Sequence, residues 1–113
     1  MEKILANLIN ELRRGTQILF VLNALKEEKY GYALLSDLEL IGVAIEAGTL
    51  YPLLRRLEEQ GLLSLKWNTE DSRPRKYYII NDNGLNVLNV LKEEWQLINN
   101  EIMVIINKGE KNE

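Results

Sequence analysis

The chain carries its clearest structural pattern in Gly48-Thr49-Leu50-Tyr51-Pro52-Leu53-Leu54-Arg55-Arg56-Leu57-Glu58. The four leucines of this block fall at positions i, i+3, i+4 and i+7, which is the spacing of one face of a helix. The pattern therefore predicts an amphipathic helix between residues 46 and 60, ended by Gly61. Arg55 and Arg56 point away from the leucine stripe.

Pro52 lies inside this helix and cannot donate a backbone hydrogen bond. Either the helix begins near Gly48, or it bends in its first turns. The sequence leaves both alternatives open.

Three shorter helices are predicted before this block by apolar residues at helical spacing. The first carries Ile4, Leu5, Leu8, Ile9 and Leu12 and ends near Gly15, and its apolar stripe needs a partner surface. The second begins at Thr16, a residue suited to capping, and runs to the charged segment 26–29. The third has about ten residues and is closed by Gly42.

The period of the sequence changes after the block, which predicts two strands. Leu63, Leu65 and Trp67 alternate with polar residues, and residues 77–80 form a second β-rich run. The polar connection 68–74 between them is typical of a protruding hairpin tip. We expect Trp67 to pack between this hairpin and the core.

A final helix is predicted from about Asn83 to Asn107, with Asn81 as its cap and a frayed tail from residue 108. Spacings of three and four along it form the seam of a coiled coil. At 1.5 Å per residue it would be ~37 Å long, which exceeds what a small domain covers. The distal half therefore predicts a second subunit, with a dimer interface formed by Leu5, Leu8, Leu88, Leu91, Trp95, Ile98, Ile102 and Ile105.

Composition excludes several classes of protein. The 113 residues, 46% hydrophobic, suit one compact domain, and no apolar run reaches the ~20 residues of a membrane span. The chain has neither histidine nor cysteine, so it lacks the usual components of hydrolytic triads and of metal sites. We expect no enzyme, metal or cofactor, no membrane association, and a location in the cytoplasm.

Charge is unevenly distributed along the chain. The net charge of −3 argues weakly against a nucleic-acid partner, but residues 48–79 carry +2 between segments of −2 and −3. A basic island therefore coincides with the predicted helix and hairpin.

The order of helices followed by a hairpin predicts a mostly α fold with a small β-hairpin, an α+β winged helix-turn-helix with an N-terminal helix and a long C-terminal dimerisation helix. Residues 1–82 would form the DNA-binding domain and residues 83–113 the dimerisation helix and tail. A helix of ~10 Å diameter fits the major groove. The side chains expected to contact DNA are Thr49, Tyr51, Arg55, Arg56, Arg73, Arg75 and Lys76.

Three other interpretations remain open. Arg55 and Arg56 could be solvated charges that pair with Glu58 and Glu59. The winged helix could serve protein contacts without binding DNA, which the net charge of −3 allows. An enzyme would have to work without histidine and cysteine, and no motif supports one.

The sequence also resembles PadR-type transcriptional regulators over roughly residues 11–95. The resemblance lies in Glu11-Leu12-Arg13-Arg14-Gly15, Tyr30-Gly31-Tyr32, the block 48–58 and Arg75-Lys76-Tyr77-Tyr78. It implies a homodimeric winged-helix repressor, with Tyr51, Arg55, Arg56 and the Arg75-Lys76 edge at the DNA backbone. The chain has Tyr30 and Glu46 where the family commonly has histidine and serine, and it ends after one helix, as in the short subgroup.

Trp95 lies on the predicted seam, and short members of this family that respond to planar aromatic drugs look similar there. The area that a tryptophan ring buries favours packing over ligand binding. The resulting hypothesis is a dimer on a pseudo-palindromic operator, released by an aromatic effector if one binds at Trp95.

Overall fold

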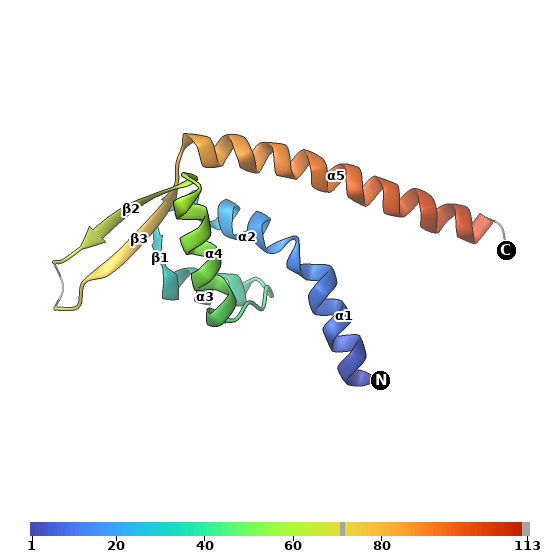
Figure 1. The fold of residues 1–113 in the computed structure, drawn as a ribbon, viewed down its shortest axis with the longest axis horizontal. Helices are drawn as coiled ribbons and strands as arrows, with labels where there is room; N and C mark the ends of the chain where they lie inside the picture. Colours follow the sequence, from blue (N-terminus) through green and yellow to red (C-terminus); the bar gives the residue numbers. More distant parts are fainter. Residues whose placement is uncertain (71, 112–113) are drawn as a thin grey trace.

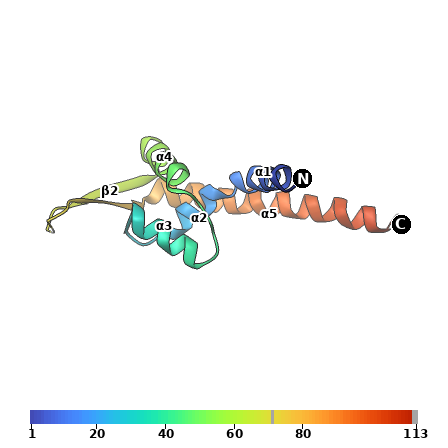
Figure 2. The same cartoon turned by 90° about the horizontal axis from the view of Figure 1, so that it is seen from below.

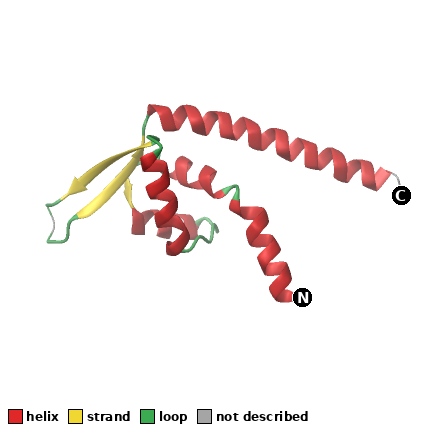
Figure 3. Ribbon diagram, in the orientation of Figure 1, coloured by secondary structure: helices red, strands yellow, loops and turns green. Residues whose placement is uncertain are grey.

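The structure is a computed structural model that describes residues 1–70 and 72–111. Five helices and three short strands form from these residues (Figures 1 and 3). The elements are α1 (Glu2–Arg14), α2 (Gln17–Ala24), β1 (Lys29–Tyr30), α3 (Gly31–Leu40), α4 (Ala47–Glu59), β2 (Leu63–Asn68), β3 (Arg75–Ile80) and α5 (Asp82–Lys111). This order confirms the predicted α+β winged helix-turn-helix with a long last helix.

The core lies where α2, α3, α4 and the sheet meet the first turns of α5. All four leucines of the α4 stripe are buried, together with leucines of α2 and α3, as their helical spacing predicted. Helix α4 begins at Ala47, close to Gly48, so Pro52 is its sixth residue. This start agrees with the first alternative, a helix that begins near Gly48.

The sheet has three antiparallel strands in the order β1-β3-β2, and not the two predicted. Strand β1 consists of two residues, with Tyr30 opposite Tyr77. A strand this short has no alternation to detect, so the sequence suggested only a break at this point. In the β2–β3 hairpin, Asn68 pairs with Arg75, and Asp71 of the predicted tip lies outside the described residues.

Helix α5 is anchored at its start to the head, the name we give to the packed body of α2, α3, α4 and the sheet. The Asn81 side-chain oxygen accepts a hydrogen bond from the Gly84 backbone N–H at 2.9 Å, which confirms the predicted cap. Leu88 is completely buried in the chain's own core and is therefore not offered to a partner, contrary to its predicted place on the seam. The helix continues to Lys111 where a frayed tail was predicted from residue 108, and residues 112–113 lie outside the described part.

Helices α1 and α5 leave the head on the same side and diverge, so both termini lie away from the sheet (Figure 1). Figure 2 shows α5 extending past the head, in a molecule whose extents are 64 × 35 × 23 Å. No residue of α1 is buried. Both helices thus carry apolar side chains in solvent, among them Ile4, Leu5, Leu8, Trp95, Ile98, Ile102 and Ile105.

Two local predictions are wrong. The Thr16 hydroxyl does not cap α2 but donates a hydrogen bond to the Arg13 carbonyl at 2.8 Å, at the end of α1. Trp67 is 61% exposed and so does not pack against the core. It lies opposite Lys76, at the end of the hairpin that projects beyond α4.

Within the described residues, no helix is both long and apolar enough to cross a membrane. The same residues contain no group of three or more acidic, histidine or cysteine side chains placed to hold a metal ion.

Candidate nucleic-acid interface

Helix α4 turns its leucine stripe to the core and its polar side to solvent. Thr49, Tyr51, Arg55 and Arg56 are all exposed, as the periodicity predicted. The same four positions cannot turn inward without exposing the leucines, because opposite faces of one helix are coupled. A surface hollow lies on each side of this face.

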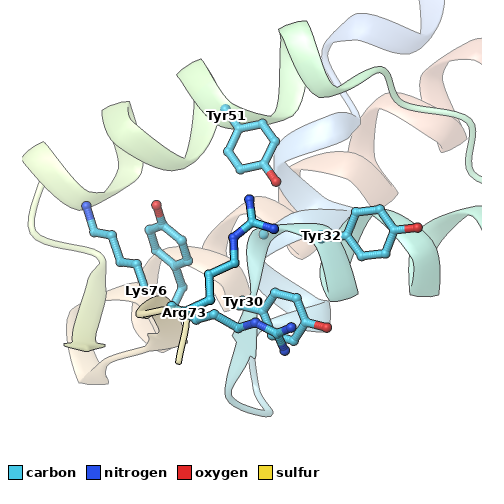
Figure 4. A pocket seen from close by; sticks show the side chains of 8 residues that line it. Tyr30, Tyr32, Tyr51, Arg73 and Lys76 are labelled. Atoms are coloured by element: carbon cyan, nitrogen blue, oxygen red, sulfur yellow. The ribbon is translucent and has the colours of Figure 1, made fainter. Parts of the chain in front are cut away.

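The first lies between α4, the start of α3 and the β2–β3 hairpin, which we call the wing. We name it the wing-side hollow, and it has a volume of about 560 Å³. Figure 4 shows tyrosine rings and basic side chains around it. Its lining residues are Tyr30, Gly31, Tyr32, Tyr51, Arg73, Arg75, Lys76 and Tyr78. Because α3 begins at Gly31, the partial positive charge of a helix N-terminus adds to that of the three basic side chains.

Tyr51 reaches across this hollow from α4 to α3. A Cβ atom placed on Gly31 would lie 2.9 Å from both Cζ and Oη of Tyr51, closer than side chains approach one another. Residue 31 must therefore be glycine for the tyrosine to keep this position. The family-like Tyr30-Gly31-Tyr32 motif has a structural reason here that no periodicity signals.

Two basic residues of the hairpin, Arg75 and Lys76, are held by aromatic rings and by one carboxylate. The Arg75 guanidinium lies 4.5 Å from the centre of the Tyr30 ring, which packs edge-on against Tyr77. The Lys76 ammonium lies 3.0 Å from a Glu58 carboxylate oxygen and 5.4 Å from the centre of the Tyr78 ring. Lys76 is thus engaged by α4 in the unbound protein.

The second, the α1-side hollow, is larger, with a volume of about 1130 Å³. It lies between the end of α1, the end of α3 and the start of α4. Thr49 and Arg56 line it together with Arg13 and Arg14 from α1, and the carboxylates of Glu39 and Glu46 lie along the same walls.

The structure therefore distributes six of the seven expected DNA contacts over the two hollows. Tyr51, Arg73, Arg75 and Lys76 share the wing-side hollow, whereas Thr49 and Arg56 belong to the α1-side hollow. Arg55 lines neither hollow and is exposed on α4. Among the described residues, neither Arg55 nor Arg56 lies within ion-pair distance of a carboxylate, and Glu58 pairs with Lys76 instead.

Sequence reasoning gave no role to several residues of these hollows. Tyr30, Tyr32 and Arg13 stand in motifs that we quoted only for their resemblance to a family. Tyr78 was assigned only to a strand. No pattern in the sequence indicates these residues, because the three motifs that contain them become neighbours only in the folded chain.

One further ion pair fixes β1 to α3 beneath the wing-side hollow. The Lys29 ammonium donates a hydrogen bond to an Asp37 carboxylate oxygen at 2.7 Å, and this bond raises the pKa of Lys29 above its ordinary value of 10.5. At the other side of the head, a hydrogen-bonding contact with Lys26 lowers the pKa of Lys92.

The interface as a whole presents positively charged side chains and hydroxyl donors on and beside the exposed face of α4. Such groups suit binding to a phosphate backbone.

Comparison with known proteins places this geometry in a family. Residues 18–90 match the Transcriptional regulator PadR-like family. A crystal structure of a PadR family transcriptional regulator from Eggerthella lenta superposes with a TM-score of 0.89 and 45% identity, over 93% of this chain and 94% of that one.

A PadR-like transcription factor from Bacteroides fragilis superposes with a TM-score of 0.74 and 32% identity, over 88% of this chain and 98% of that one. A transcriptional regulator of Mycobacterium tuberculosis is 37% identical over 71 residues, which cover 62% of this chain and 66% of that protein. The alignment thus spans slightly less than two thirds of this curated relative.

Proposed function

The chain belongs to the PadR-like family of transcriptional regulators, and from this premise we propose that it acts as a homodimeric repressor that binds a pseudo-palindromic DNA operator. In this proposal the α4 face enters the major groove, and the wing contacts the phosphates beside it. A role in transcriptional regulation is consistent with the expectation that the chain is not an enzyme.

The observation that carries this proposal is the exposed face of α4. Its leucines fix the helix on the core, while Tyr51, Arg55 and Arg56 face outward, and Tyr51 lies beside the basic residues of the wing. A surface helix with this arrangement can enter a groove about 12 Å wide without unfolding any part of the head. Arginine and tyrosine at such positions contact phosphates, and Thr49 can reach a base edge.

Dimerisation is supported by the two apolar helices that leave the head. Helix α1 exposes its whole stripe, and α5 exposes Trp95, Ile98, Ile102 and Ile105. Exposed apolar surface of this extent is typical of an interaction site. Leu85, Leu88 and Leu91 pack on the head, so the dimerisation segment we propose for residues 83–113 has its free surface beyond Leu91.

A pair of heads related by a twofold axis would read two half-sites about 34 Å apart on one face of the duplex. The proposal therefore predicts a symmetric protected region when the protein is added to DNA flanking its own gene. A footprint with one half-site, or none, would contradict it.

The decisive experiment is electrophoretic retardation of duplexes from that flanking DNA at low ionic strength. We expect wild-type protein to retard one of them, and Arg55→Ala combined with Arg56→Ala to weaken binding at least tenfold. Lys26→Ala combined with Lys92→Ala removes the same charge outside both hollows and should bind nearly as wild type does. A protein-interaction module would retard no duplex, and the two double variants would behave alike.

The regulatory direction is tested separately with a reporter gene placed behind the retarded DNA. A repressor lowers reporter output when it is expressed, and the Arg55→Ala/Arg56→Ala variant restores the output. An increase in output with the wild type would show an activator.

The proposal extends to an aromatic effector that binds at Trp95 and releases the DNA. Trp95 lies on the seam of α5 and is 42% exposed in the single chain. In a Trp67→Phe variant, Trp95 is the only tryptophan, so its fluorescence can be titrated with planar aromatic compounds. Quenching that accompanies release of DNA would support an effector site. Unchanged fluorescence across a varied panel would leave operator binding without an effector.

A further inference from the structure

We propose that Arg13 and Arg14, at the end of α1, form a second wall for the DNA backbone, on the side of α4 opposite the wing. This inference rests on the proposed function, because it assigns these two residues to the phosphate backbone of the DNA strand that the wing does not reach. It gives a role to a motif that helical periodicity left unexplained.

The first step is the position of the two arginines. Both line the α1-side hollow with Arg56 and Thr49 of α4, so that the end of a helix without buried residues lies beside the exposed helix of the head. Both are exposed, and within the described residues neither lies within ion-pair distance of a carboxylate. Their charges are therefore available to a ligand.

The second step is the shape of the duplex. A helix with its side chains is about 10 to 12 Å across and fills the major groove, so a phosphate backbone borders it on each side. The wing-side hollow, with Arg73 and Arg75, meets one of these backbones. The α1-side hollow then faces the other, and Arg13 and Arg14 are its cations from outside α4.

Two carboxylates oppose this role. Glu39 and Glu46 line the same hollow, so its walls carry three positive and two negative side chains. The excess of positive charge is small, and DNA binding at this wall should therefore depend strongly on both arginines of α1. It should also weaken steeply with salt, as binding to phosphates does.

An alternative role for the arginines is purely structural. Basic residues in the last turn of a helix interact favourably with its C-terminal dipole, and both stand in that turn of α1. This role would affect the stability of the protein or its dimer, and in a variant that stays dimeric it would leave the salt dependence of DNA binding unchanged.

The test compares three double variants on a duplex that wild-type protein retards. Arg13→Gln with Arg14→Gln should lower affinity about tenfold or more in ~0.1 M salt and reduce the slope of log K against log salt by about 0.9 for each phosphate that is no longer neutralised. Arg13→Lys with Arg14→Lys keeps the charges and should retain most of the slope. Lys26→Gln with Lys92→Gln matches the loss of charge away from both hollows and should change the slope little.

Circular dichroism and sedimentation of the same variants show whether fold and dimer are intact. If the glutamine variant stays folded and dimeric but has the affinity and salt slope of the Lys26/Lys92 control, the second wall does not exist and the proposed function still stands. If it loses the dimer, and a covalently linked dimer of the variant binds like the wild type, the arginines are structural. If wild-type protein retards no duplex, both proposals fail.

Discussion

Gly31 is the residue on which the position of Tyr51 depends. A methyl group there would overlap the tyrosine ring, so Gly31→Ala must displace either the ring or the start of α3. We expect weaker DNA binding together with a loss of about 1 kcal/mol in the free energy of unfolding, because the side chain of Tyr51 is exposed and can rotate away. Gly48→Ala is the control, because an added Cβ there meets nothing within 4 Å.

Chemical denaturation of the two variants checks this prediction. Equal stability of Gly31→Ala and Gly48→Ala would show that Tyr51 moves aside freely, and the wing-side hollow would then not be preformed.

Glu58 holds Lys76 away from a ligand. Its carboxylate lies 3.0 Å from the Lys76 ammonium, and both side chains are about 30% exposed. Because an ion pair this exposed contributes at most about 1 kcal/mol, a phosphate can replace the carboxylate. Glu58→Gln should therefore strengthen DNA binding severalfold and leave the free energy of unfolding nearly unchanged.

The matched control is Glu59→Gln, which removes the same charge from the neighbouring residue, where the described part of the chain contains no ion pair. Binding titrations at one salt concentration compare the two. An equal gain in both variants would mean that only net charge matters, and that Lys76 does not contact DNA.

Among the helices, α5 depends on Gly84 for its seat on the head. A Cβ at this position would collide with the backbone carbonyl of Leu62, which cannot rotate away as a side chain does. Gly84→Ala should therefore lower the free energy of unfolding by about 2 kcal/mol or more. Gly109→Ala, in open space on the same helix, should change it by less than about 1 kcal/mol and in the stabilising direction.

Thermal unfolding of both variants checks the anchoring of α5. A Gly84→Ala protein as stable as the wild type would mean that the helix shifts along the head at little cost, and the direction in which α5 leaves the head would then not be fixed.

At the scale of the whole molecule, the exposed apolar sides of α1 and α5 favour contact with a partner. Trp95, Ile98, Ile102 and Ile105 lie along one side of α5 and are exposed in the single chain. Ile98→Asp with Ile102→Asp places two charges on this side and should give a monomer in sedimentation experiments. Its DNA affinity should fall, because each head then binds alone.

Gln96→Asp with Asn100→Asp is the control, since these residues lie on the opposite side of the same helix and add the same charge. This variant should remain dimeric. If both variants sediment as the wild type does, the seam of α5 does not form the interface.

The leucine stripe of α4, its outward arginines and the Asn81 cap were all correctly predicted, because each depends on residues three or four positions apart in one helix. The order of these elements was sufficient to predict the winged helix. The motifs in residues 11–95 indicated the family.

Only the folded chain decides which of these residues come into contact. Strand β1 has only two residues, Lys76 pairs with a carboxylate 18 positions away, and each hollow combines residues from four elements. Folding also buries Leu88 in the core and leaves Trp67 in solvent, although each belongs to a periodic pattern of apolar residues. Spacing in a sequence reports neighbours along one element, whereas contacts between elements depend on how their faces pack.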